Sequence, residues 1–206
     1  MKLAVFAFDS TLMDGETIDF LAHACGVGAE VEAITTAAMN GELDFFESLS
    51  RRVKLLEGLS YEKALEICQN LPFICGAKET ITELKNRGYK VVIFSGGFQL
   101  ATSHARGLLG FDMDFSNVLH QKDGRLTGLV GGEMMFSDSK GVMIQKIQAL
   151  LGATPETTIV VGDGANDRSM FVYASTRIAF CAKEALKKEA NIIIDTKDLR
   201  EILKAI

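Results

Sequence analysis

Short apolar runs recur along the chain, separated by segments with the periodicity of helices. Runs of this length, bounded by turn residues, are typical of buried strands. We predict strands at residues 2–8, 90–94 and 158–161, and weaker ones at 177–180 and 191–194.

The segments between these runs predict helices over residues 78–87, 98–109 and 141–151, each followed by a glycine where a left-handed C-terminal cap belongs. In the last of these, apolar side chains recur at the spacing of one helical face and are expected to face a core: Met143, Ile147, Leu150 and Leu151. Strands that alternate with helices predict an α/β fold, a doubly wound, mostly parallel sheet with helices on both faces.

From about residue 15 to residue 71 the pattern is helical throughout. The expected helical pieces are roughly 17–25, 29–39, 44–56 and 61–70. Short helices inserted after the first strand indicate a small helical cap, so we expect a core domain of residues 1–14 and 72–206 and a cap domain of residues 15–71. A hairpin is also expected within residues 117–136, with its turn at 122–125.

The composition narrows the function classes. The chain has 206 residues, of which 48% are hydrophobic and 24% charged, and its net charge is -5. An acidic surface argues against a nucleic-acid or membrane-surface partner and favours a small-molecule substrate. The 4 cysteines have no metal-site spacing, which predicts free thiols, mostly packed inside, in a reducing cytoplasm. No segment has the length and apolarity of a membrane span, and the sequence leaves the oligomeric state open.

Polar clusters follow three of the predicted strands. They are Asp9-Ser-Thr11 after the first strand, Ser95-Gly-Gly97 after the second, and Asp163 to Asp167 after the third. A fourth polar position, Lys140, stands at the start of a predicted helix. In an open α/β sheet the carboxyl ends of the strands form the ligand crevice, so three of the clusters are expected to converge there.

The chemistry of these clusters suits a phosphate ester and a magnesium ion. Ser95 and the backbone around Gly96 are suited to cradle phosphate oxygens, and Lys140 offers a point charge to a phosphoryl group. Asp163 and Asp167 are hard oxygen ligands of the kind Mg²⁺ prefers.

Asp9 is suited to protonate a leaving alkoxide and then to act as base for an attacking water. A nucleophile is expected on the same face of the strand, two residues earlier, because side chains alternate between the faces of a sheet. That position is Ala7.

The order and wording of these motifs resemble the haloacid dehalogenase superfamily and, within it, the family of phosphoserine phosphatases. The first family motif, D-x-D-S-T, is here Ala7-Phe-Asp9-Ser-Thr11. The others are similar to Ser95-Gly96-Gly97-Phe98, Lys140-Gly141 and Gly162-Asp-Gly-Ala-Asn-Asp-Arg-Ser-Met170. The likeness extends over essentially the whole chain and implies a haloacid dehalogenase-like fold with a helical cap inserted after the first strand.

The resemblance also implies roles for particular residues. Mg²⁺ would lie on the nucleophile at position 7, the backbone carbonyl of Asp9 and Asp163, with Asp167 in support. The phosphate or its surroundings would be contacted by the following residues: Ser95, Gly96, Lys140 and Asn166.

In such a family, a glutamate and an arginine associated with the cap select the substrate by its ammonium and carboxylate groups, and the matching residues are Glu16 and Arg52. Arg52 has support of its own. It falls within about 20° of Phe45 on a helical wheel, so it lies on an apolar face where a cation must find an anion or reach outward.

The resemblance predicts Mg²⁺-dependent hydrolysis of O-phosphoserine to serine and phosphate through an aspartyl-phosphate, the last step of serine biosynthesis. A methyl group at Ala7 neither attacks phosphorus nor ligates a metal, so this form is expected to be inactive. Ala7 is either an engineered substitution, made to trap substrate, or natural. Alternatives are a phosphotransferase that uses phosphoserine, a phosphatase for another small phosphomonoester, and a natural non-catalytic metabolite-binding protein.

Overall fold

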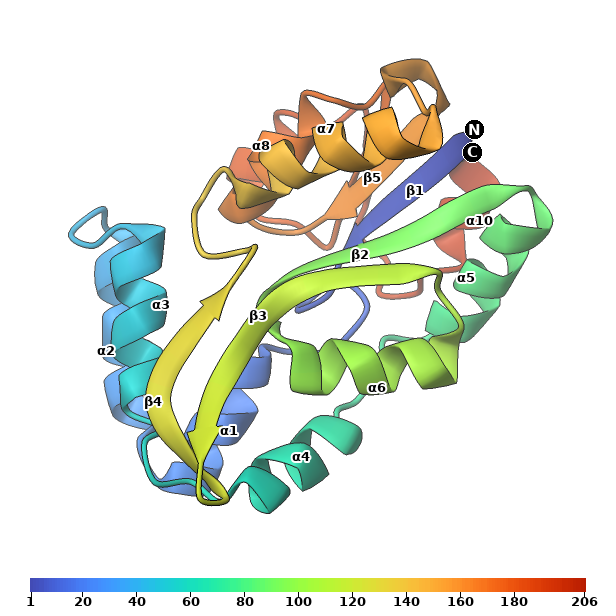
Figure 1. Ribbon diagram of the computed structural model, residues 1–206. Helices are drawn as coiled ribbons and strands as arrows, with labels where there is room; N and C mark the ends of the chain where they lie inside the picture. Colours follow the sequence, from blue (N-terminus) through green and yellow to red (C-terminus); the bar gives the residue numbers. More distant parts are fainter.

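The computed structural model describes residues 1–206 and is built on one sheet of 7 strands (Figure 1). The strands are β1 (Lys2–Ala7), β2 (Tyr89–Phe98), β3 (Met113–Lys122), β4 (Arg125–Gly132), β5 (Thr158–Gly162), β6 (Thr176–Phe180) and β7 (Ile192–Ile194). Their order across the sheet is β4-β3-β2-β1-β5-β6-β7, and every pair is parallel except the β3–β4 hairpin. The predicted doubly wound, mostly parallel sheet is confirmed.

Helices cover both faces of this sheet (Figure 1). They are α1 (Thr17–Cys25), α2 (Gly28–Met39), α3 (Phe45–Lys54), α4 (Tyr61–Gln69), α5 (Ala77–Asn86), α6 (Gln99–Leu109), α7 (Ser139–Leu151), α8 (Arg168–Phe171), α9 (Glu184–Lys187) and α10 (Glu201–Ala205). In Figure 1, α7 and α8 lie on one face, while α5, α6 and α10 lie on the other.

The central strand β1 shows why the chain folds into these layers. Its interior residues are fully buried, and they alternate between two hydrophobic cores. Leu3 and Val5 belong to the core under α7 and α8, whereas Ala4 and Phe6 belong to the core under α5, α6 and α10. A strand buried on both faces needs a continuous apolar sequence, which is the pattern of residues 2–8.

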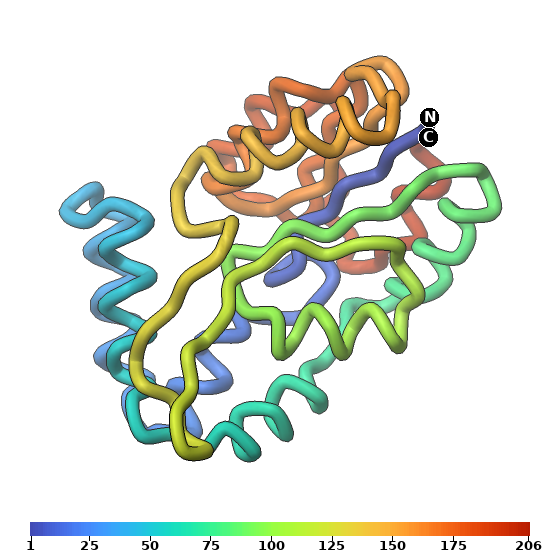
Figure 2. Tube along the Cα trace, in the orientation of Figure 1, coloured from blue at the N-terminus to red at the C-terminus, as the bar shows by residue number.

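The four helices between β1 and α5 form a layer at one end of the sheet, near β3 and β4 (Figure 2). α3 packs against β4, and α4 packs against α6. Their apolar side chains, Leu49, Val53 and Leu56 among them, belong to the same core as the α5–α6 face of the sheet. The inserted helices are therefore anchored on the sheet by shared burial of apolar surface.

Two expectations about burial were wrong. Leu150 of α7 is 74% exposed; it lies in the last turn of the helix, about 120° around the axis from the fully buried Ile144. The cysteines are free, as expected, but most are not packed inside: only Cys68 is buried, and both Cys75 and Cys181 are exposed. Separately, none of the helices combines the length and the apolar character that crossing a membrane requires.

Candidate active site

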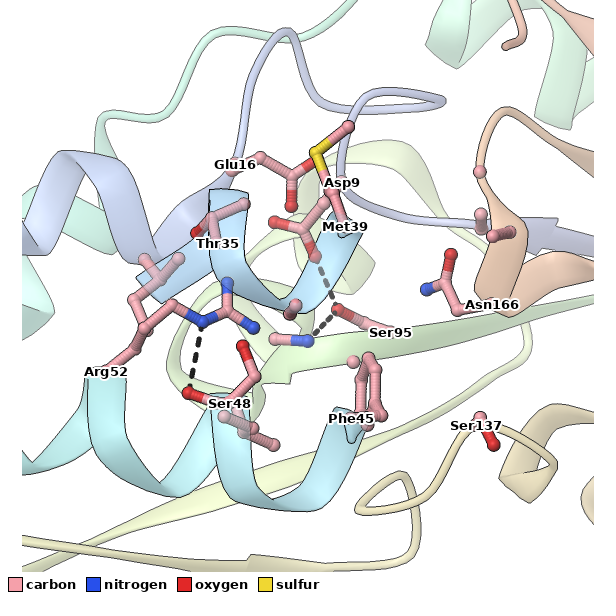
Figure 3. Close-up of a pocket in the computed structure, with 18 of the residues that line it drawn as sticks. Asp9, Glu16, Thr35, Met39, Phe45, Ser48, Arg52, Ser95, Ser137 and Asn166 are labelled. Carbon is pink, nitrogen blue, oxygen red and sulfur yellow. Dashed lines mark hydrogen bonds between the residues drawn. The ribbon is translucent and has the colours of Figure 1, made fainter. Parts of the chain in front are cut away.

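A cavity of about 420 Å³ opens where β1, β2 and β5 end and the inserted helices face the sheet (Figure 3). Because β1 lies between β2 and β5, the polar clusters that follow these strands meet at one edge. The cavity is lined by every predicted site residue except Asp167: Ala7, Asp9, Glu16, Arg52, Ser95, Gly96, Lys140, Asp163 and Asn166. Asp167 lies directly behind the wall and is fully buried.

The carboxylate of Asp9 is fixed by three hydrogen bonds. Its Oδ1 accepts from the backbone N–H of Thr17 at 2.7 Å and from the Thr17 hydroxyl at 2.6 Å, while its Oδ2 accepts from the Ser95 hydroxyl at 2.7 Å. Thr17 begins α1, so an inserted helix holds a residue of the core. Thr17 was not among the predicted site residues, although a hydroxyl residue at the start of a predicted helix was an available signal.

The Ser95–Gly97 loop, which the structure places within the end of β2, depends on its two glycines. The Ser95 hydroxyl oxygen accepts a hydrogen bond from the N–H of Gly97 at 2.9 Å. A Cβ on Gly97 would lie 2.8 Å from Asp9 Oδ2, and one on Gly96 would lie 3.0 Å from the ring of Phe45 in α3. Glycine is therefore required for the close approach of this backbone to the cavity.

Lys140 and Asp167 form a buried ion pair, with 2.6 Å between Nζ and Oδ1. The other oxygen of Asp167 accepts from the backbone N–H groups of Asp163 and Gly164, at 2.9 and 3.0 Å. Asp167 thus ties the start of α7 to the loop after β5. Since its carboxylate is used in this way, Asp167 shapes the loop that carries Asp163 and Asn166.

Two carboxyl groups of the cavity hold protons unusually well. Burial, reinforced by the negative charge of Asp167, raises the pKa of Asp163 to about 7, against a hydrogen bond at 3.0 Å from the Thr11 hydroxyl. Glu16 also lines the cavity, and burial of its carboxyl together with the charge of Asp9 raises its pKa to about 8. A cation near either group would favour its ionised form and so lower its pKa.

Arg52 presents most of its guanidinium to the cavity. Its Nε donates to the backbone carbonyl of Ser48 at 3.3 Å, and the side chain pairs with no carboxylate of the chain. Burial lowers its pKa, an effect that the charges of Glu16 and Asp19 oppose. Figure 3 shows the guanidinium pointing into the space that Glu16 and Asp9 also face. Free donors in a fork geometry there suit a ligand carboxylate.

Similarity to known proteins shows the family of the chain. Residues 1–175 match the haloacid dehalogenase-like hydrolases. The chain belongs to this hydrolase family. Phosphoserine phosphatase from Wolinella succinogenes is 66% identical over 203 residues, 98% of each chain. That from Methanocaldococcus jannaschii is 50% identical, covering 100% of this chain and 97% of its own.

Solved structures agree with these relatives. A substrate-bound phosphoserine phosphatase complex superposes with a TM-score of 0.94 at 50% identity, covering 100% of this chain and 98% of that one. A phospho-aspartyl intermediate analogue of phosphoserine phosphatase gives the same TM-score. The chain is thus a haloacid dehalogenase-like hydrolase with phosphoserine phosphatases among its similar relatives.

One wall position of this hydrolase site carries no functional group. Ala7 ends β1, is 2% exposed and lines the cavity with its methyl group. The chain holds no group of three or more His, Cys, Asp or Glu side chains arranged to bind a metal. Asp163 offers carboxylate oxygens of the kind a divalent cation prefers, in a position where burial raises its pKa.

Proposed function

We propose that this chain is a phosphoserine phosphatase scaffold, built for Mg²⁺-dependent hydrolysis of O-phosphoserine to serine and phosphate. We further propose that Ala7 occupies the position of the nucleophilic aspartate, so that this form binds the substrate without turning it over. The observation that carries the proposal is the free guanidinium of Arg52 beside Glu16, in the same cavity as the Ser95–Gly97 loop. The similar phosphoserine phosphatases support it.

The substrate would be read at both ends. Arg52 would bind its carboxylate by a charge-assisted, bidentate contact. Glu16 would bind the ammonium group, and the raised pKa means that the Glu16 carboxyl loses its proton as that cation arrives. At the other end, the phosphate would be held by the residues at the strand ends: Ser95, Gly96, Lys140 and Asn166.

Proton transfer is the task of Asp9. Its carboxylate is held by Thr17 and Ser95, so it is oriented before the substrate arrives. In a form with aspartate at position 7, the carboxylate attacks phosphorus while the bond to the serine oxygen breaks, and Asp9 gives its proton to that oxygen. Asp9 then takes a proton from the water that hydrolyses the acyl phosphate.

The donors present fit Mg²⁺ in part. Asp163 and the backbone carbonyl of Asp9 would hold it, with Asp167 supporting the loop, and position 7 contributes no oxygen in this form. When bound, the ion supplies positive charge that screens the phosphate from the surrounding carboxylates. The inserted segment, residues 15–71, would act as the substrate-selecting cap over the core of residues 1–14 and 72–206.

The deciding experiment is Ala7→Asp with a phosphate-release assay on O-phosphoserine and Mg²⁺. We expect turnover in Ala7→Asp and none above background in the parent or in an Ala7→Asn control, which restores polarity without a nucleophile. An Ala7→Asp form that folds, binds phosphoserine and releases no phosphate would favour a non-catalytic binding protein instead. A phosphoester formed with an added alcohol would indicate a phosphotransferase.

A further inference from the structure

The pairing of β2 with β3 is interrupted beside the candidate site. Phe94 pairs with Phe115, and the next pair is Phe98 with Asn117. Residues 95–97 of β2 therefore face a single residue of β3, residue 116. Such a bulge lifts the backbone out of the ladder and leaves groups that need other hydrogen-bond partners.

Asn117 supplies one such partner, to Gly96, from a fully buried position. Its Nδ2 donates to the carbonyl oxygen of Gly96 at 3.0 Å and to that of Met134 at 3.1 Å. Its Oδ1 accepts from the N–H of Met134 at 3.0 Å. One side-chain amide thus connects the bulge of β2 with the segment that follows β4.

The space for this amide is provided by Gly132, which pairs with Asn117 across the hairpin. A Cβ on Gly132 would lie 2.7 Å from both Oδ1 and Cα of Asn117, and Gly132 has a φ of 148°, which side chains rarely adopt. Any larger residue at position 132 would therefore displace the Asn117 amide.

The two connected segments both lead into the candidate site. Gly96 lies in the loop proposed to hold phosphate, and Met134 precedes α7, which carries Lys140. We infer that Asn117 is a positioning residue. It touches no substrate but fixes the position of the phosphate loop relative to the start of α7. The inference rests on the proposed function for what the loop binds, whereas the connection itself is independent of it.

The test replaces the amide with an apolar side chain of similar size, Asn117→Leu. Gln148→Leu is a matched control, because Gln148 is also buried and donates to the Thr158 hydroxyl and the Tyr173 carbonyl at 2.9 and 2.8 Å. Thr158 begins β5, so this amide lies at the end of the strand away from the cavity. Both variants lose buried hydrogen bonds and are expected to unfold at lower temperature.

Calorimetric titration of the Ala7 chain with inorganic phosphate and with O-phosphoserine separates an effect on the geometry of the site from a general loss of stability. We expect Asn117→Leu to weaken both affinities about tenfold, and Gln148→Leu to leave them unchanged. In the Ala7→Asp form, kcat should fall by up to about 10²-fold in Asn117→Leu alone, the scale of a misplaced site. Equal phosphate affinities in Asn117→Leu, Gln148→Leu and the parent would overturn the inference.

Amide hydrogen exchange in the ligand-free chain distinguishes this inference from the proposed function. We expect exchange at Gly97, whose N–H donates to Ser95, to be faster in Asn117→Leu and unchanged in Gln148→Leu. Faster exchange supports the inference even if Ala7→Asp hydrolyses no phosphoserine, while unchanged exchange contradicts it even if hydrolysis is restored. Asn117→Asp, which keeps the acceptor and loses the donors, replaces Asn117→Leu if the latter does not fold.

Discussion

The two sides of the cavity differ in how their charged groups are held. On the sheet side, the carboxylates of Asp9 and Asp167 each accept three hydrogen bonds from groups of the chain. On the helical side, Glu16 accepts one side-chain hydrogen bond, from Ser10, and Arg52 makes one, to a backbone carbonyl. Under the proposed function, the sheet side would be a preorganised reaction side, and the helical side would be a recognition side whose partners come with the ligand.

The largest effect is expected on the reaction side, from Asp9→Asn in the Ala7→Asp form. An amide retains an acceptor for Thr17 and can donate to the Ser95 oxygen, but it carries out no proton transfer, so kcat for phosphoserine should fall about 10²- to 10⁴-fold. Steady-state kinetics check this, with an aryl phosphate as comparison substrate. Its leaving group departs without a proton, so the loss should be smaller; equal losses would mean that Asp9 acts only by holding its neighbours.

The recognition side predicts a different signature for Arg52→Ala, measured in the Ala7→Asp form. Losing a charge-assisted contact with the substrate carboxylate should cost about 2 kcal/mol, or about 30-fold in kcat/KM for phosphoserine. Aryl phosphate, which has no such carboxylate, should be hydrolysed as before. Arg51→Ala is the matched control, because Arg51 is exposed and pairs only with Glu47. A similar loss on both substrates would place Arg52 outside substrate recognition.

Sequence alone predicted the sheet and the meeting of the clusters because both depend on local pattern and general topology. Apolar runs buried on two faces define strands, and parallel strands end at a common edge. That was enough to bring Asp9 and Ser95 together across a separation of 86 residues.

The pairing of individual side chains was not predictable in this way. Lys140 was assigned to phosphate by its charge, and nothing in its neighbourhood along the chain indicates the buried contact with Asp167. Thr17 and Asn117 were missed for the same reason. Their partners are set by helix placement and by a two-residue excess in one strand, which arise from packing between distant segments.

The raised pKa of Glu16 predicts that the affinity for phosphoserine depends on pH. Because its pKa in the empty site is raised to about 8, the carboxyl is mostly protonated at pH 7 and about half ionised at pH 8. If the ionised form binds the substrate ammonium, affinity for phosphoserine should be about fivefold weaker at pH 7 than at pH 8. Calorimetry of the Ala7 form in buffers of different ionisation enthalpy should also detect release of about one proton at pH 7.

Glu16→Gln is the control for this titration, since it removes the titrating group and retains the shape. It should bind phosphoserine more weakly, with neither proton release nor a change in affinity between pH 7 and pH 8. Proton uptake by the parent, or release that persists in Glu16→Gln, would assign the titration to another group.

The smallest predicted effect concerns a contact that joins the two sides directly. Phe46 of α3 stacks on Phe136, in the segment between β4 and α7, with ring centroids 5.4 Å apart and planes 12° from parallel. Both rings are otherwise exposed, at 44% and 58%. Because the stack is already formed in this structure, a double-mutant cycle with Phe46→Leu and Phe136→Leu should give a coupling of about 0.5–1.5 kcal/mol in the free energy of unfolding and none in phosphoserine affinity. Coupling in phosphoserine affinity would instead mean that α3 moves relative to residue 136 when the substrate binds.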